Sequence, residues 1–129
     1  LELRHDPRLL DAYRDAITDL GREVLPPSVE GVRPLGSTDM GNISHMLPSI
    51  HPLIGIDSDG ARTHEVEFAA AAASASADQA VVDGAIALAR TASTAALDGR
   101  WRDDLLEAHS RRMGQRPQMM SKSQIVGNR

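Results

Sequence analysis

The apolar run at residues 46–56 constrains the fold most, because it is where the chain can form a β-strand. Pro48 and Pro52 exclude a helix in this run and are awkward within a central strand. A short buried strand over residues 53–56, or an edge strand, is therefore expected. Since one or two strands do not make a stable sheet, the run predicts a piece of a larger α/β unit whose other strands lie elsewhere.

The first helix is predicted from its start and its end. Asp6 is a good N-cap and Pro7 suits the first helical position. Apolar residues then recur at helical spacing as far as Leu20, and Gly21 predicts the stop. Residues 25–34, which hold three prolines and a glycine, are expected to be a linker or extended connection.

Residues 57–60, with the sequence DSDG, predict a polar turn directly after the apolar run. Two further helices are expected beyond this turn. Thr63 is expected to cap a short helix through residues 65–73. Ser76 and Gln79 have the spacing of a capping box, which predicts a longer helix ending near Leu97. That helix carries five apolar residues on one face, namely Val81, Ala85, Leu88, Ala92 and Ala95.

The C-terminal region is predicted to divide in two. A weaker helix is expected over residues 101–113, with Trp101 on its apolar side. Residues 1–113 are expected to form the folded part, and residues 114–129, which show no periodicity, a disordered tail. The chain begins at Leu1 without an initiator Met, which predicts a processed or truncated piece.

Composition narrows the classes of protein. The 129 residues are 41% hydrophobic and 25% charged, as in a soluble globular chain, but only 2% aromatic, so any core is thin. A net charge of −4 argues against a nucleic-acid partner. The longest apolar run, at 68–73, predicts no membrane span. The absence of cysteine fits a reducing compartment, and a cytoplasmic protein is expected.

His64 is a candidate metal ligand by its position between a turn and a helix start. Imidazole is a common zinc ligand, and such a junction can hold it rigidly. The alternative from the residues alone is a surface histidine. Glu67 lies three residues on and is either an outer hydrogen-bond acceptor for the imidazole or a solvated carboxylate. His51 is expected to be buried and hydrogen-bonded, and His5 and His109 to lie on the surface.

Residues 36–44 are predicted to form a polar loop, and its first turn, at Gly36, Ser37, Thr38 and Asp39, is a candidate anion pocket. Glycine lets successive N–H groups point one way, and the hydroxyls add donors for a substrate carboxylate. Asp39 is expected to bond backbone N–H groups that close the turn, and His45 borders the same loop. An ordinary polar turn is the alternative.

Three stretches taken together resemble a known family. The stretch GSTDMGNISHMLPSIHPLIGI, the stretch RTHEVEFAAAA and the Ala-rich helix that follows are similar to the C-terminal part of the dinuclear-zinc amidohydrolase and peptidase family. Aminoacylase, carboxypeptidase G and succinyl-diaminopimelate desuccinylase belong to it. The nearest subgroup is that of the dipeptidases and aminobenzoyl-glutamate hydrolases. The resemblance covers approximately residues 9–97.

The resemblance implies a fold and a role for each of the candidate residues. It implies an α/β fold, namely the C-terminal segment of a three-layer catalytic domain, helix-rich with one or two strands. His64 would be the last ligand of a pair of zinc ions, and Gly36, Ser37 and Thr38 would lie at the substrate end of the cleft. Asp39, His45 and Glu67 would support these residues.

The implied function belongs to the intact enzyme. The other metal ligands and the glutamate general base would come from an N-terminal half or a partner chain, so no catalytic residue is expected in this chain. The intact homo-oligomer, such as a dimer, would hydrolyse the amide bond of a small carboxylate-bearing substrate or dipeptide. A non-catalytic binding or assembly domain derived from the same fold is the alternative.

Overall fold

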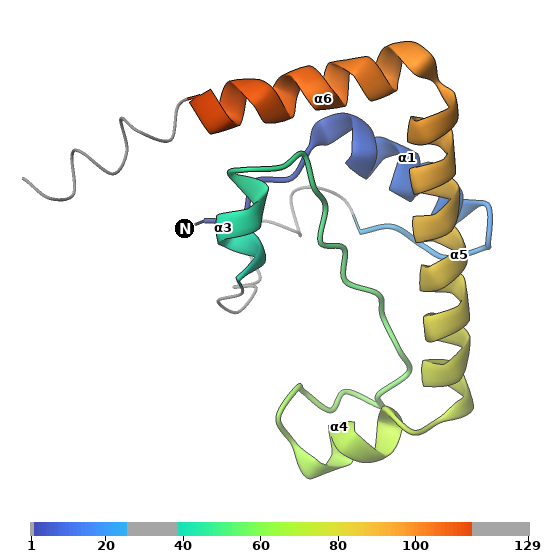
Figure 1. Cartoon of the computed structure of the whole chain (residues 1–129). Helices are drawn as coiled ribbons and strands as arrows, with labels where there is room; N and C mark the ends of the chain where they lie inside the picture. The colour runs from blue at the N-terminus through green and yellow to red at the C-terminus, as the bar shows by residue number, and fades with distance from the viewer. Residues whose placement is uncertain (1, 26–38, 115–129) are drawn as a thin grey trace, which may run out of the picture.

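The computed structural model describes residues 2–25 and 39–114, which form a helical hook (Figure 1). Its helices are α1 (Pro7–Thr18), α3 (Met40–Ser44), α4 (Val66–Ala71), α5 (Ala75–Leu97) and α6 (Gly99–Gly114). The long helix α5 is the straight central element, between α4 and α6. Helix α6 turns away from its C-terminal end, α1 lies beside it, and α4 projects near its N-terminal end.

The predicted start and end of the first helix are confirmed in α1. The side chain of Asp6 accepts a hydrogen bond from the Leu9 N–H at 3.1 Å, and Pro7 occupies the first turn, where no N–H is needed. Beyond the helix end, Gly21 has φ of 82°, a left-handed conformation that glycine adopts without strain. Local signals are therefore sufficient to set the limits of this helix.

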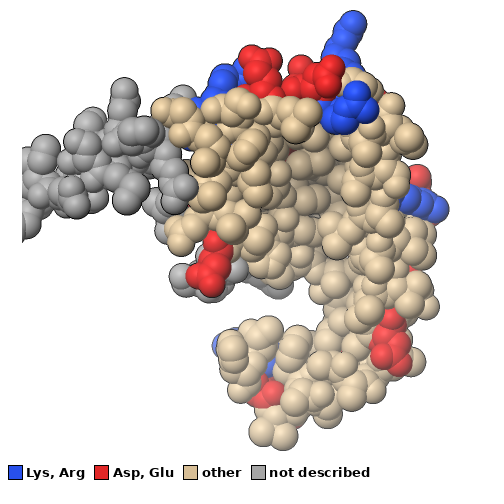
Figure 2. All heavy atoms as spheres, in the orientation of Figure 1, with Lys and Arg blue, Asp and Glu red and all other residues tan. Residues whose placement is uncertain are grey.

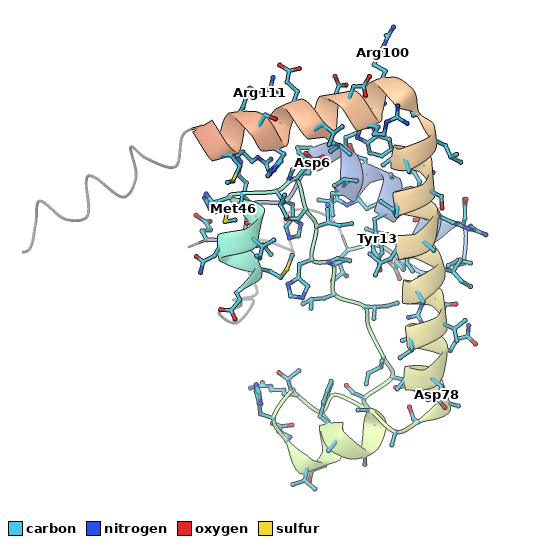
Figure 3. All side chains as sticks on the ribbon, viewed as in Figure 1. Asp6, Tyr13, Met46, Asp78, Arg100 and Arg111 are labelled. Atoms are coloured by element: carbon cyan, nitrogen blue, oxygen red, sulfur yellow. The ribbon has the colours of Figure 1, made fainter. Side chains whose placement is uncertain are left out.

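The core is small and lies between α1 and α5. Tyr13, Ala16 and Ile17 of α1 are buried against Ala87 of α5, which is 0% exposed. Figure 3 shows Tyr13 in the space between the two helices. Four partly buried apolar residues complete the cluster, namely Leu20, Val24, Ile50 and Ile54. Because alanine removes little area from water, most of the apolar burial comes from the larger side chains of α1.

The corner between α5 and α6 is organised by Asp98. This residue ends α5, and its Oδ1 atom accepts a hydrogen bond from the Trp101 N–H at 3.0 Å in the first turn of α6. The Trp101 N–H lowers the pKa of the Asp98 carboxyl, and the nearby Arg8 guanidinium acts in the same direction. Arg8 also lies 4.4 Å from the centre of the Trp101 ring, a cation–π contact that joins α1 to the corner.

Two predicted helix starts are wrong. The N-cap of α5 is Ser74, whose side chain accepts from the Ala77 N–H, whereas Ser76 lies inside the helix and accepts a hydrogen bond from the Asp57 N–H. Helix α4 starts after Glu65 rather than at a Thr63 cap. Before α5, Ser74 and Ser76 lie two residues apart, so spacing alone did not select the one that caps, and α4 has no side-chain cap at its start. Helix α6 begins slightly before the predicted 101–113 helix.

The apolar face noted on α5 is largely exposed. Val81 is 71% and Leu88 46% exposed, whereas the buried positions of α5 are Ala77, Ala80, Asp83, Ala87, Thr91 and Ala95. By length and composition alone, α5 is also long and apolar enough to cross a membrane, although the sequence predicted that no segment is. Only 28% of its most apolar stretch is buried. The length of uninterrupted apolar runs did not reveal this property of α5, because isolated polar residues divide the helix into short apolar runs.

The predicted strand over residues 53–56 is not present in the described part of the chain. This segment follows an extended course from α3 to α4 and forms no ladder there (Figure 1). A strand needs a neighbouring strand to satisfy its backbone groups, and the described residues provide none. The predicted polar loop over 36–44 is also wrong in its second half, where α3 forms.

The predicted linker and the predicted tail fall almost entirely outside the described residues. The linker over 25–34 is described only at Leu25, and the tail beyond Gly114 is not described. The described part is helix-rich, as predicted, and the α/β class stays a prediction.

Candidate functional site

A tight turn over residues 58–61 begins the candidate site. The Ala61 N–H donates to the Ser58 carbonyl at 2.9 Å, and the Ser58 hydroxyl donates to the Ala61 carbonyl at 3.0 Å. The two central residues, Asp59 and Gly60, have φ of 49° and 81°. Two successive left-handed residues reverse the chain as a type I′ turn does, and Asp-Gly is a preferred pair for it. The sequence DSDG is therefore read correctly as a polar turn.

His64 lies in a second turn, immediately before α4. Its φ is 76°, which costs about 1–2 kcal/mol for a residue with a side chain. Neighbouring bonds hold the turn: the Glu65 N–H donates to the Arg62 carbonyl at 3.1 Å, and the Arg62 N–H donates to Glu65 Oε2 at 2.8 Å. The imidazole itself is exposed and forms no hydrogen bond within the described residues. Its ring nitrogens are therefore available to a ligand.

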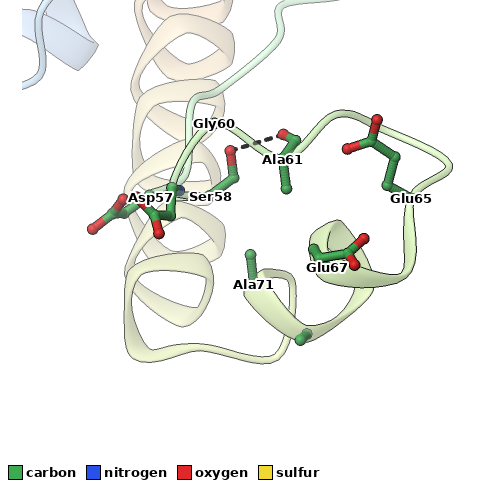
Figure 4. Close-up of a pocket in the computed structure, with 9 residues that line it drawn as sticks. Asp57, Ser58, Gly60, Ala61, Glu65, Glu67 and Ala71 are labelled. Atoms are coloured by element: carbon green, nitrogen blue, oxygen red, sulfur yellow. Dashed lines mark hydrogen bonds between the residues drawn. The ribbon is translucent and has the colours of Figure 1, made fainter.

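An open cavity of about 580 Å³ separates the 58–61 turn from α4 (Figure 4). Four acidic residues are among those that line it, namely Asp57, Asp59, Glu65 and Glu67, and the two alanines at 70 and 71 line it from α4. The walls come from a turn and a two-turn helix rather than from the α1–α5 core. The position of the cavity walls therefore depends on the contacts that attach the 58–61 turn and α4 to α5.

The described residues do not form a complete metal centre. No group of three or more His, Asp or Glu side chains in the described ranges is placed to hold a metal ion, and a zinc site needs three or four ligands. Glu67 forms no hydrogen bond to His64 in this part of the chain. His64 can therefore supply at most one ligand to a site completed by residues outside the described part.

The predicted anion pocket falls mostly outside the described residues. Gly36, Ser37 and Thr38 are not described. Asp39 is exposed and sits at the N-cap position of α3, but its carboxylate makes no capping hydrogen bond to that helix. The backbone carbonyl of Asp39 instead accepts from the Asn42 and Ile43 N–H groups.

The other histidines are mostly engaged with backbone. Nε2 of His45 lies 2.9 Å from the Glu2 carbonyl oxygen, and Nδ1 of His109 lies 3.0 Å from that of Met46. His109 is half-buried and joins α6 to the segment after α3, so the prediction of a surface residue is wrong for it. His51 is half-buried and forms no hydrogen bond in the described part, contrary to expectation. Of these residues, His64 is the most exposed.

Sequence reasoning missed the ion pair that anchors the extended segment. Nε of Arg22 lies 2.7 Å from Asp83 Oδ2, and Nη1 of Arg22 donates to the Gly55 carbonyl at 2.9 Å. Gln79 donates to the other oxygen of Asp83 at 2.8 Å. The signal available in the sequence was Asp83, a carboxylate that follows Gln79 by four residues on an Ala-rich helix. A carboxylate is buried in a protein only when it has hydrogen-bond or ion-pair partners.

These hydrogen bonds set the ionisation of Asp83. The Arg22 guanidinium, and then the Gln79 amide, lower the pKa of the carboxyl below its ordinary value, and burial acts weakly in the opposite direction. The side chain is therefore charged at neutral pH. Arg22 and Asp83 thus connect three segments: the residues that follow α1, helix α5, and the extended chain that leads to His64.

Comparison with known proteins gives one kind of relative. The chain is 37% identical over 99 residues to the Xaa-Arg dipeptidase of Mus musculus, and equally identical over the same length to that of Homo sapiens. Each match covers 77% of this chain and 22% of the relative, so the chain spans about a fifth of the length of these proteins. No family model and no solved structure matches. The chain is similar to one portion of dipeptidase-like proteins.

Proposed function

We propose that this chain is the C-terminal portion of a metal-dependent amidohydrolase of the dipeptidase type. The observation that carries the proposal is the 37% identity to the Xaa-Arg dipeptidases over 99 residues. The share of those relatives that is matched, 22%, supports a division in which most of the enzyme lies outside this chain. The substrate would be a small dipeptide, and its amide bond would be hydrolysed by the intact enzyme.

The proposed role of His64 is to provide one metal ligand. Support comes from its exposed and unbonded imidazole, and from a left-handed backbone held by the Glu65 and Arg62 hydrogen bonds. Zinc, when bound, would polarise the substrate carbonyl and a water molecule. The described residues alone do not fit such a centre, so the remaining ligands are assigned to the rest of the enzyme.

The proposed substrate pocket includes Gly36, Ser37 and Thr38. Their N–H and hydroxyl groups would bind the substrate carboxylate, with Asp39 and His45 beside them. Glu67 would contribute through the wall of the acidic cavity. A cytoplasmic homo-oligomer is part of the same proposal, as is pairing with an N-terminal half.

The test uses the complete gene product and a dipeptide with C-terminal arginine, because the relatives are named for such substrates. Chelation should abolish hydrolysis and zinc should restore it. His64→Asn removes the ligand but keeps a residue that tolerates a left-handed backbone. It should lower bound zinc and reduce kcat/KM by more than about 100-fold, since even the outer partners of metal ligands contribute 10- to 100-fold.

Thr63→Ala is the matched control at the neighbouring exposed position, and it should change neither zinc content nor turnover. Unchanged zinc and turnover in His64→Asn would show that the ligand assignment is wrong. Ser37→Ala and Thr38→Ala should raise KM with little effect on kcat. A complete protein that binds no zinc and cleaves no dipeptide would instead indicate the binding or assembly domain.

A further inference from the structure

The left-handed backbone of His64 is not held by packing within the described part of the chain. A φ of 76° is unfavourable for a residue with a side chain, and such residues persist only where surrounding contacts determine them. Residues 62–67 are all exposed, and α4, which follows the turn, has no buried residue. Figure 2 shows an open hollow between α4 and the rest of the molecule. Among the described residues, the contacts that hold His64 therefore lie within the turn itself.

Two hydrogen bonds close this turn between Arg62 and Glu65. The Glu65 N–H donates to the Arg62 carbonyl at 3.1 Å, the bond from the first to the fourth residue that many turns make. The Glu65 side chain adds a second bond, because its Oε2 atom accepts from the Arg62 N–H at 2.8 Å. Only the second bond depends on a side chain, so the identity of residue 65 controls it.

The Glu65 carboxylate serves the turn and not the helix that follows. Glu65 occupies the N-cap position of α4, where a side-chain oxygen ordinarily accepts from an N–H of the first helical turn, but it makes no such bond. Glu67, which the sequence predicted to support His64, forms no hydrogen bond to it in the described part of the chain. The side chain that supports His64 is therefore that of Glu65, which acts through the backbone.

The backbone angle of His64 determines where its imidazole points. Rotation about the N–Cα bond moves Cβ around that bond, so a residue at φ 76° presents its side chain on a different side of the chain than at the ordinary negative φ. In the present geometry, the imidazole is exposed and forms no hydrogen bond within the described residues. A change of φ at His64 would redirect the imidazole without altering its chemistry.

We propose that Glu65 is a positioning residue for His64: its carboxylate holds His64 in the left-handed conformation and thereby sets the direction of the imidazole. The proposal rests on the proposed function in one respect, namely that the imidazole takes part in dipeptide hydrolysis. The role requires an oxygen acceptor at the end of a side chain of this length, not a negative charge. Glutamine provides such an acceptor.

Amide hydrogen exchange in the complete gene product tests the effect of Glu65 on the turn. Protection of the residue-65 amide reports its bond to the Arg62 carbonyl, whichever side chain stands at 65. Glu65→Ala should lower this protection about tenfold or more, and Glu65→Gln should retain it. In a His64→Gly background, Glu65→Ala should lower it much less, because glycine adopts the left-handed conformation without strain. Equal losses in the two backgrounds, or no loss in either, would overturn the proposal.

Hydrolysis of a dipeptide with C-terminal arginine by the same variants tests the effect on function. Glu65→Ala should reduce kcat/KM about tenfold or more, mostly through kcat, because the imidazole is present but misdirected. Glu65→Gln should restore most of the activity. Arg62→Ala is the matched control, since it removes a neighbouring exposed side chain but keeps the N–H that donates to Glu65, and it should change neither protection nor turnover. Lost protection with unchanged kcat in Glu65→Ala would show that the bond is structural only, and would overturn the positioning role.

Two further results separate the proposal from a helix-capping role and from the proposed function. Glu65→Ser supplies a preferred N-cap for α4 but shortens the side chain, so it should behave as Glu65→Ala does. Recovery of activity in Glu65→Ser, or equal losses in Glu65→Gln and Glu65→Ala, would overturn the proposal. If the wild-type complete protein cleaves no dipeptide, the dipeptidase assignment fails, and the exchange data alone decide whether Glu65 holds His64.

Discussion

The body formed by α1, α5 and α6 and the arm over residues 57–74 are held in different ways. The body has a buried cluster around Ile17 and Ala87 and a corner organised by Asp98. The arm contains α4, which has no buried residue, and the Ser76–Asp57 hydrogen bond attaches its first residue to α5. Just before the arm, Arg22 holds the chain at Gly55.

The contrast suggests how the molecule divides its tasks. The body combines an apolar cluster with polar contacts such as the Arg22–Asp83 pair. The arm carries His64 and the acidic cavity, but a few directed bonds determine where it lies. Segments with few buried apolar contacts open at low free-energy cost. The proposed ligand is thus on the part of the fold that most needs an additional surface to hold it.

The largest expected effect on stability comes from the core of the body. Ile17 is 5% exposed, and Ile17→Ala should cost about 2–5 kcal/mol because it removes buried methylenes and leaves a cavity. Val66 of the arm is 83% exposed, so Val66→Ala should stay within about 0.5 kcal/mol. Urea unfolding of both variants measures the difference. Similar losses would contradict the division into body and arm.

Removal of the Arg22–Asp83 ion pair should have the second-largest effect on stability. It should also change amide exchange in the segment that leads into the arm. Arg22→Met leaves Asp83 buried beside an apolar side chain, and should lower the melting temperature and speed amide exchange over residues 55–57. The double variant Arg22→Met, Asp83→Leu should recover melting temperature but not the exchange protection, because the bond to Gly55 stays absent. Recovery of both would show that Arg22 does not hold the segment.

The same pair predicts a pH dependence with a definite sign. The folded-state pKa of Asp83 is lowered, so the folded protein binds fewer protons than the unfolded chain in acid. The contribution is present above the ordinary pKa of 3.8 and is lost as pH falls further. Urea unfolding at pH 6 and pH 3 should show a smaller acid loss in Asp83→Asn than in the wild type. An equal loss would assign the acid sensitivity to other carboxylates.

Two serines on either side of the start of α5 give a smaller, matched pair of effects. Ser74→Ala removes the N-cap and should destabilise α5 by about 1 kcal/mol. Ser76→Ala removes the hydroxyl that accepts from the Asp57 N–H and should increase exchange at that amide, with a global loss of about 1 kcal/mol or less. Circular dichroism melts and amide exchange separate the two. A larger helix loss in Ser76→Ala would restore the predicted capping box.

No loss of stability is expected at His64. His64→Gly removes the side chain that strains a left-handed residue, so stability should hold or rise by up to about 1 kcal/mol. Thermal melts of the 129-residue chain provide the measurement. A clear loss of stability would show that the imidazole has a structural role in the arm, and would weaken its assignment as a ligand.

Signals that act over a few residues were read correctly from the sequence. The Asp6–Pro7 start, the Gly21 stop, the Asp-Gly turn and the end of α5 near Leu97 all depend on backbone preferences of adjacent residues. The resemblance to dipeptidases was also available without a structure, because it rests on residue order. The roles of Gly36, Ser37 and Thr38 stay predictions, since these residues are not described.

Contacts between distant residues were decided by the tertiary structure. Whether α5 buries Val81 or Ala87 depends on where α1 packs, and whether Ser74 or Ser76 caps depends on where the Asp57 N–H arrives. The strand pattern over residues 53–56 is a local property, yet a strand forms only when a neighbour satisfies its backbone. Local sequence signals therefore determined the start of α1, the Asp-Gly turn and the presence of the long helix, because they act between adjacent residues. The packing of α1 on α5 determined which helix faces are buried, because it depends on residues far apart in the sequence.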